Sequence, residues 1–566
     1  MAKLKPNSAL AIFLTVVFTV ALIGFFQNSI FSISPINIPY QLKKFGTEAF
    51  KSSTKDIDKY KSIINHRPKK NKIQWGSKKT GSKSTQKTLD IDYSSEKDLL
   101  GSWTDWVYDI SLDKILKNIS PPGSAKGAIC ASPSKYEPDY FYHWIRDSAL
   151  VIRFIRSEAE NPNISRSRKL ELEKIMLDFL NFSKLIASRP HETAKLGEPK
   201  YNMDGSAFLQ EWGRPQNDGP ALRAIALLEY AEYLLSDKSK FPDTHKRKEI
   251  VAGMYCPTCI INKDLDYIIE NFGTPGFEIW EEVKGLHYYT STVQVKALKA
   301  GLEFAIKMGD SESAEKYKLK LNQTEKYSDT FWSASDKYVK STVNWAGGMP
   351  KKYKELDSQV ILALIHTWDK NLNLIQPEIL IRTLSTMMKL FDVFVSEYHI
   401  NQIGIPGIGM GRYKGDRYNG YNSRGEGNPW PLITCSVSEV YYKLVLKIIK
   451  EKKILMDNDL SKFIEYSNNN IYSGSEIPQI IKYWKSENIS IHDDRFKVIV
   501  QLLFYTGDEF LERLKYHTAS DGSMSEQWNR NTGFNQGARD LTWSYTAFCT
   551  MKNARDAAKS ALNSLE

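Results

Sequence analysis

Cysteine is scarce in this chain of 566 residues, and the five cysteines that it has are an odd number. Cys256 and Cys259 are spaced as a CxxC pair, which is compatible with a local disulfide, a redox pair, two free thiols or half of a zinc site. The chain has no second CxxC to complete a zinc site, and no βαβ pattern of the thioredoxin type surrounds this one. We therefore expect a structural bridge or two free thiols here, and at least one thiol left unpaired within the chain.

The chain also lacks sustained runs of alternating apolar and polar residues, so strands do not compete with helices as the main element. After Pro220, apolar residues recur at the spacing of one helix face, at Ala221, Ala224, Ile225, Leu228, Ala231 and Leu235. The same pattern runs from Val295 onward, and we expect Gly309 to end that helix. An apolar helical pattern also follows the motifs at residues 146–148, 428–430 and 539–540. Most of the chemically rich motifs therefore precede or open a long apolar helix.

An excess of positive over negative charge is missing from most of the chain, although the formal net charge is +11. Residues 41–89 hold 14 Lys or Arg against 3 Asp or Glu, which is about the whole surplus, so we expect no nucleic-acid partner. Residues 66–88 have too few apolar side chains to fold alone, and we interpret 41–94 as a basic flexible tether. Such a tether can also contact anionic lipid or cell-wall polymer.

Residues 1–40 are expected to lie outside the folded domain. Lys3 and Lys5 precede an uncharged run from Ala9 to Phe26, about the length of a membrane-spanning helix. The run is typical of a cleaved secretory signal or of an uncleaved signal anchor, and we favour the anchor because bulky residues 25–28 leave no clean cleavage site.

The two lysines predict a cytoplasmic amino terminus and a lumenal or extracellular remainder; cleavage would instead give a secreted or vacuolar protein. Glycosylation acceptor triplets are weak evidence for that compartment, and they begin at Asn118, Asn163, Asn181, Asn322 and Asn488.

Residues 278–283, Glu-Ile-Trp-Glu-Glu-Val, place three carboxylates around the indole of Trp280. Like charges so close together should raise the pKa of at least one carboxyl, which suits a general acid, and the flat indole face suits stacking on a sugar. A solvated acidic turn explains this segment alone equally well. Glu526, between Ser525 and Gln527, supplies the second carboxylate that cleavage of a glycosidic bond requires.

These two segments, with residues 140–148, 212–220, 427–430 and 538–545, resemble the fungal glucoamylases of glycoside hydrolase family 15. The six motifs occur in the expected order, and the resemblance covers about residues 95–560. It implies that residues 95–566 are an all-α catalytic domain, an (α/α)6 barrel with an inner ring of helices inside an outer one. Periodicity by itself predicts only the helices.

The resemblance implies that Glu281 is the general acid and Glu526 the general base of an inverting hydrolysis, with the two carboxyls about 6.5–9.5 Å apart. It implies a sugar-binding role for further residues: Tyr140, Arg146, Asp147, Trp212, Trp280, Glu282, Arg412 and Trp430. The chain departs from the family at Glu278, where related sequences usually have Asp, so the role of Glu278 stays open.

Several of these positions also have a simpler interpretation. From the residues alone, we favour Arg146 and Asp147 as an ordinary ion pair at a helix start, and Trp430 can be a core residue. Residues 407–411 resemble a nucleotide loop, but they lack the preceding strand and the Lys-Ser/Thr ending, so they more simply let the backbone turn and present Arg412.

The resemblance predicts an exo-acting glucan 1,4-alpha-glucosidase that releases β-glucose from non-reducing ends of starch, glycogen and maltooligosaccharides. We expect a monomer without metal or cofactor. The alternatives are another α-glucoside hydrolase of the trehalase or dextran type, an inverting phosphorylase, in which Glu526 has no obvious role, and an inactive membrane-tethered glycan-binding protein. The presence of both Glu281 and Glu526 argues against the last. No starch-binding module is visible, so we expect glycogen and soluble oligosaccharides to be better substrates than granular starch.

Overall fold

The computed structural model describes residues 74–77, 87–90, 98–236, 238–240, 243–349, 356–369, 371–456, 458–471 and 488–565. Contacts divide the chain into two units, Met1–Ser95 and Glu96–Glu566. In the first unit, β1 (Gln74–Ser77) and β2 (Lys87–Asp90) pair antiparallel, with Trp75 opposite Leu89. The prediction of a tether did not include this pair, which the strand preference of Trp and Thr residues favours.

The predicted signal or anchor at residues 9–26 lies outside the described residues. Among the helices that are described, none combines the length and the apolar character that spanning a bilayer requires.

The second unit consists mainly of helices, as the sequence predicts. Its helices are α3 (Leu99–Lys117), α4 (Ile145–Ala159), α5 (Arg166–Ala187), α6 (Asp218–Leu234), α7 (Thr244–Ala252), α8 (Ile260–Asn271), α9 (Tyr288–Met308), α10 (Ser311–Thr324), α11 (Gln359–Thr367), α12 (Glu378–Glu397), α13 (Pro431–Glu451), α14 (Asn458–Ile471), α16 (Asp494–His517) and α17 (Thr542–Asn563), with 3-10 turns η1 (Tyr327–Phe331) and η2 (His399–Gln402).

Six of these helices form a closed inner ring. Each contacts the next, in the order α4, α6, α9, α11, α13 and α17, and α17 contacts α4 to close the ring. A second set packs outside it, because α5, α8, α10, α12, α16 and α3 contact the same inner helices in the same order. Inner and outer helices alternate along the chain, which is the (α/α)6 arrangement that the resemblance implied.

Local sequence explains where the inner helices begin and end. Pro220 lies in the first turn of α6 and Pro431 is the first residue of α13, where a missing N–H costs no hydrogen bond. Helix α9 ends at Gly309, whose backbone is left-handed with φ 73°. The inner helices are buried around most of their circumference; in α6, for example, only Glu229 and Glu232 are not buried.

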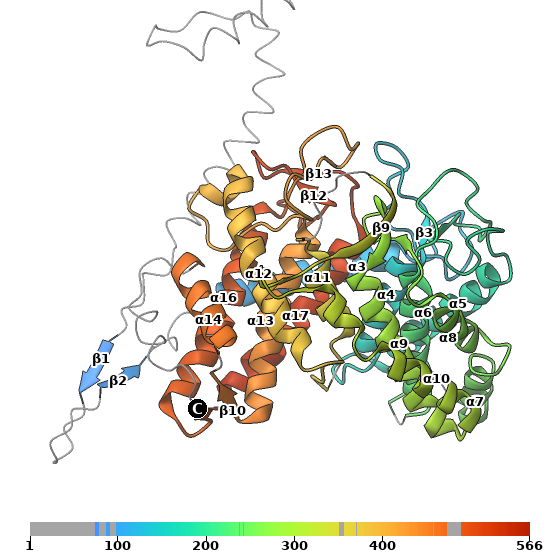
Figure 1. Ribbon diagram of the computed structural model, residues 1–566, viewed down its shortest axis with the longest axis horizontal. Coiled ribbons are helices and arrows are strands. Elements are labelled where there is room, and N and C mark those ends of the chain that lie inside the picture. Colours follow the sequence, from blue (N-terminus) through green and yellow to red (C-terminus); the bar gives the residue numbers. More distant parts are fainter. Residues whose placement is uncertain are drawn as a thin grey trace, which may run out of the picture. The chain divides into compact units, whose positions relative to one another are not determined.

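Strands are short and lie in the connections between helices. They are β3 (His143–Trp144), β4 (Lys200–Tyr201), β5 (Gly276–Phe277), β6 (Val283–His287), β7 (Trp332–Ser333), β8 (Tyr338–Val339), β9 (Thr342–Gly348), β10 (Lys453–Leu455), β11 (Asn488–Ser490), β12 (Gln527–Trp528) and β13 (Asn535–Gln536). The pairs β3–β4 and β12–β13 and the three-stranded sheet β5–β6–β9 are antiparallel. Figure 1 shows β3, β9, β12 and β13 along the same edge of the helical body.

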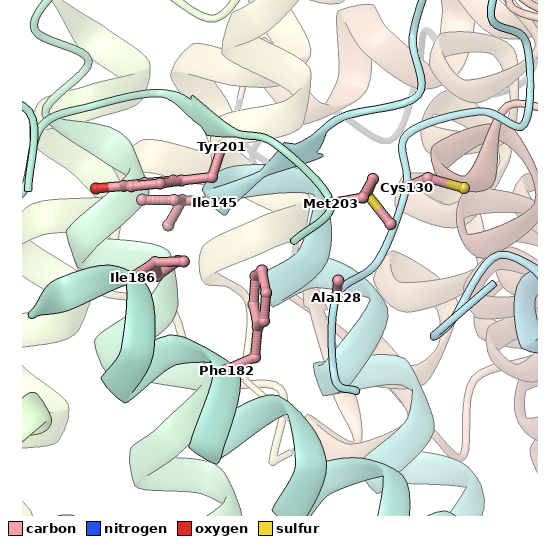
Figure 2. Packing of buried hydrophobic residues seen from close by; sticks show 7 residues of the cluster. All are labelled: Ala128, Cys130, Ile145, Phe182, Ile186, Tyr201 and Met203. Carbon is pink, nitrogen blue, oxygen red and sulfur yellow. The ribbon is translucent and has the colours of Figure 1, made fainter. Parts of the chain in front are cut away.

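A hydrophobic cluster supports β3, β4 and the start of α4 from below. Figure 2 shows the buried side chains of Ala128, Cys130, Ile145, Phe182, Ile186, Tyr201 and Met203. Because this cluster contains residues from α4, α5 and β4, it holds the first turn of α4 against the β3–β4 connection.

The cysteines follow the simplest of the predicted arrangements. Cys256 and Cys259 form a disulfide just before α8, so they are not half of a zinc site. Cys130, Cys435 and Cys549 are free and buried. The prediction that at least one thiol stays unpaired is confirmed.

Candidate active site

The segments that lead into the inner helices bring polar and aromatic side chains together. These residues are Trp144 and Arg146 at α4, Gln216 and Asp218 at α6, Glu281 and Glu282 before α9, Asp357 before α11, Trp430 before α13, and Glu526 before α17. They are joined by the contacts described below. Helix starts from distant parts of the chain therefore build one site, as expected from the position of the motifs.

Glu281 lies in the turn between β5 and β6 with a left-handed backbone, φ 65°, which is uncommon for a residue other than glycine. Its Oε1 accepts hydrogen bonds from Nε1 of Trp144 at 2.7 Å and from Nε2 of Gln216 at 2.9 Å. Nη2 of Arg146 lies 3.9 Å from the same oxygen. Oε2 of Glu281 has no hydrogen-bond partner within the part of the chain that the structure describes.

Glu526 lies directly before β12 and is almost completely buried. Tyr140 donates its hydroxyl to Oε1 of Glu526 at 2.9 Å, and the hydroxyl of Tyr418 lies 3.2 Å from Oε2. Burial raises the pKa of Glu526 to about 7, while the hydrogen bond from Tyr140 and the charge of Arg412 counteract part of that rise.

Tyr140 and Trp144 connect the two carboxylates through one short segment of chain. Tyr140 binds Glu526, Trp144 binds Glu281, and the centroids of the two rings are 5.5 Å apart. The aromatic segment that precedes α4 therefore fixes Glu281 and Glu526 relative to each other.

The three carboxylates of residues 278–282 do not share one environment, and this corrects the expectation that mutual repulsion governs them. The Glu278 carboxylate accepts backbone N–H groups of Trp280, Glu282 and Val283, the last two at 3.1 Å, and stabilises the turn. Glu282 accepts from Nη2 of Arg412 at 2.8 Å and from the hydroxyl of Tyr413 at 2.7 Å. Each carboxylate therefore has hydrogen-bond partners of its own.

Arg146 has a stronger partner than its neighbour Asp147. Its Nη1 lies 2.8 Å from Oδ2 of the buried Asp218 and donates to Oε1 of Gln216 at 3.1 Å, whereas Asp147 is 3.7 Å away. The pair that the residues alone favoured, Arg146 with Asp147, is therefore the weaker contact. Burial raises the pKa of Asp147 to about 6, and the charge of Arg146 opposes that rise.

Arg412 lies beside Trp280 and Trp430 and pairs with acidic side chains. Asp416 accepts from its Nε at 2.7 Å and from its Nη2 at 2.6 Å, in addition to the bond with Glu282. Its guanidinium carbon lies 5.2 Å from the ring of Tyr418 and 5.7 Å from that of Trp430. The arginine is thus locked in place and supports aromatic side chains.

Trp280 is a buried residue whose indole is held by side chains from distant segments. It is 7% exposed, its indole N–H faces the carboxylate of Asp357 at 2.9 Å, and its ring centroid is 5.6 Å from that of Trp430. Trp430 is buried beside Trp280, as expected for a core residue. Its neighbours are nevertheless residues that we assign to the site.

Trp212 is the most open of the predicted sugar-binding residues, with 38% of its surface exposed. Its ring centroid lies 6.3 Å from that of Trp144. Nζ of the buried Lys200 lies 3.3 Å from the centroid of the Trp212 ring, and burial lowers the pKa of this lysine to about 8. This corner of the site therefore combines an aromatic face with a cation.

Sequence reasoning did not single out Trp144, Gln216, Tyr418 and Lys200. Trp144 and Gln216 lie inside motifs that were recognised, and their side-chain partners could have been sought there. Tyr418 and Lys200 carried no signal of their own, because their importance comes from tertiary contacts with Glu526 and Trp212.

The chain is similar to proteins of known family. A family model described as glycosyl hydrolases family 15 matches residues 109–553. A glucoamylase of Blastobotrys adeninivorans is 33% identical over 493 residues, covering 84% of this chain and 76% of the relative. An intracellular, sporulation-specific glucoamylase of Saccharomyces cerevisiae is 34% identical over 483 residues, covering 79% and 83%.

The fold has a counterpart among solved structures. The glucoamylase of Saccharomycopsis fibuligera superposes with a TM-score of 0.71 at 30% sequence identity, covering 83% of this chain and 98% of that one.

Proposed function

The chain belongs to glycosyl hydrolase family 15, and from this premise we propose that Glu281 and Glu526 are the acid and base of its reaction. The enzyme hydrolyses α-glucans and releases glucose, the glucan 1,4-alpha-glucosidase activity of glucoamylases. The oligomeric state that we propose is a monomer.

Glu281 is suited to donate the proton to the glycosidic oxygen. Trp144 and Gln216 both donate to its Oε1, so they hold the carboxyl group in one orientation and leave Oε2 to carry the transferable proton. Arg146, bound to Asp218, stands beside the same carboxyl and presents a planar set of donors to the hydroxyls of the terminal sugar. Asp147 supplies an acceptor next to it.

Glu526 is suited to take a proton from the attacking water. A general base must be ionised before it acts, and the two phenolic hydroxyls of Tyr140 and Tyr418 stabilise its carboxylate form. Water activated on the face of the sugar opposite to Glu281 displaces the leaving group directly, so the anomeric centre inverts. Trp280 and Trp430, supported by Arg412 and its partner Glu282, form one wall of the proposed pocket, and Trp212 beside Trp144 forms another.

The main support for this proposal is the link Glu281–Trp144–Tyr140–Glu526, because it ties an acid and a base that are far apart in the sequence to one aromatic segment. Glu281→Gln and Glu526→Gln test it. Both variants should lose turnover of maltose by several orders of magnitude while they still bind an oligosaccharide, since only a proton donor or acceptor is removed. A folded Glu281→Gln or Glu526→Gln enzyme with near-normal turnover would remove that residue from its role.

We also propose that the uncharged run from Ala9 to Phe26 anchors the enzyme in a membrane, with the catalytic domain on the lumenal or extracellular side. The composition of this run and the two lysines before it support the proposal.

A further inference from the structure

Most of the exposed aromatic side chains lie on connections that carry or adjoin the residues of the proposed active site. Among the described residues, six aromatic residues are large and exposed, and they are Trp106, Tyr136, Trp212, Trp345, Tyr421 and Phe534. All except Trp106, which belongs to α3, lie on connections that carry or adjoin the catalytic and sugar-binding residues. Exposed apolar groups that gather in one region of a surface are typical of a binding site.

Two of these residues lie on the side of Glu526. Tyr421 is 51% exposed and follows Tyr418 in the same loop, while Phe534 is 71% exposed and directly precedes β13, which pairs with β12. The two loops are joined, because Nε2 of Gln536 donates to the backbone oxygen of Asn419 at 2.6 Å. Tyr421 and Phe534 are therefore each two residues away in the sequence from a residue of this hydrogen bond, Asn419 and Gln536 respectively.

Trp345 lies on the side of Glu281. It is 60% exposed in β9, the strand that pairs with β6 directly after Glu282. The backbone N–H of Met349 donates to the backbone oxygen of Glu282 at 2.7 Å, so β9 is attached to the turn that bears the acid.

Tyr136 lies in the loop before Tyr140. It is 73% exposed, its backbone oxygen accepts from the hydroxyl of Ser134 at 3.0 Å, and the backbone N–H of Tyr140 donates to the oxygen of Ser134 at 2.9 Å. Figure 1 shows the strands next to these loops, β3, β9, β12 and β13, along one edge of the domain. The exposed rings thus belong to segments that carry site residues or are hydrogen-bonded to the segments that carry them.

We propose that Tyr136, Trp345, Tyr421 and Phe534 form an aromatic collar that binds the part of an α-glucan chain remaining outside the pocket. This inference rests on the proposed function, because an enzyme that cleaves at a chain end holds the terminal sugars inside and must let the rest of the chain leave over the rim. Aromatic rings offer flat faces to sugar rings and lose little conformational freedom when they bind. The ligand class is therefore polymeric and branched α-glucan, and maltose is too short to reach the collar.

Several weak contacts on one polymer add to its retention at the enzyme, because each bound segment keeps the others at high local concentration. A catalytic domain with such a collar holds glycogen without an additional binding module.

The test compares the triple variant Trp345→Ala, Tyr421→Ala, Phe534→Ala with Trp106→Ala, which removes an exposed aromatic ring on α3. Glycogen binding is measured by the retardation of the folded protein in gels that contain glycogen, and kcat/KM is measured on glycogen and on maltose. We expect the triple variant to lose retardation and roughly tenfold in kcat/KM on glycogen, with kcat/KM on maltose within about twofold of the parent. Trp106→Ala should behave as the parent protein.

Unchanged retardation and unchanged glycogen kinetics in the triple variant would overturn the collar, and so would an equal loss on maltose and glycogen, which would place the residues in the pocket or the fold. Retardation is also measured with Glu281→Gln, where turnover is absent. If the parent enzyme released no glucose from either substrate, the proposed function would fail, while the retardation assay would still decide whether the collar binds glycogen.

Discussion

The hydroxyl of Tyr140 donates a hydrogen bond of 2.9 Å to Oε1 of Glu526. Four residues later the same segment places Trp144 against Glu281, and α4 follows at once. A phenol that donates to a carboxylate favours the ionised form of that carboxylate, which is the form a general base needs. The protonation of Glu526 thus depends on Tyr140, and the ring of Tyr140 also packs on Trp144, the residue that donates to Glu281.

Removal of this hydrogen bond should alter the pH dependence of the enzyme. Burial raises the pKa of Glu526 to about 7, and Tyr140 lowers it, so Tyr140→Phe should raise the pKa of Glu526 further. The ionised fraction of Glu526 at a given pH then falls, and the acid limb of kcat/KM should move to higher pH. A pH series of kcat/KM on maltose checks this.

Tyr142→Phe is the matched control, since the Tyr142 hydroxyl lies 3.2 Å from Asp139 and does not contact Glu526. Its acid limb should stay in place. An unmoved limb in Tyr140→Phe would mean that another group controls ionisation on the acid side.

Gly537 should be required for the position of the base. Its φ is 76°, and a Cβ atom there would lie 2.4 Å from Oε2 of Glu526. Gly537→Ala should therefore displace the carboxylate and lower kcat by roughly a hundredfold, because small displacements of reacting groups cost that much. Steady-state kinetics and thermal unfolding of the purified variant provide the measurement.

Gly309→Ala separates the effect on the base from backbone strain. Gly309 has nearly the same backbone, φ 73°, but a Cβ atom there meets nothing within 4 Å. Both variants should lose about 1–2 kcal/mol of stability from the left-handed backbone, and Gly309→Ala should keep its kcat. Equal kcat in the two variants would argue against a role for the contact with Glu526.

The anchor proposal predicts how the native enzyme is distributed. If residues 9–26 are retained, the protein should sediment with membranes and resist carbonate extraction. A chain lacking residues 1–40 should stay in the supernatant. A soluble native enzyme whose sequence begins after Phe26 would show that the run is a cleaved signal.

Local sequence was enough to predict several of the helices that follow the motifs. The apolar spacing after Pro220 and the stop at Gly309 depend only on neighbouring residues, and the structure has helices α6 and α9 there. The closure of the inner ring depends on contacts between distant helices, so it came from the family resemblance and not from periodicity.

Side-chain direction was the part that sequence could not supply. The segment Glu278 to Glu282 looks like a cluster of like charges, yet the carboxylate of Glu278 turns back to backbone N–H groups and that of Glu282 faces Arg412. The indole N–H of Trp280 likewise faces Asp357, a partner that the local sequence does not indicate. These directions are set by partners more than 70 residues away in the chain for Trp280 and more than 100 for Glu282.

We propose that Glu281 and Glu526 act as acid and base in one direct displacement. The anomeric form of glucose freshly released from maltose, followed by proton nuclear magnetic resonance before mutarotation, tests this mechanism. A single displacement predicts that β-glucose appears first from the α-linkage. If α-glucose appears first, a double displacement takes place, and the assignment of Glu526 as the base that activates water is contradicted.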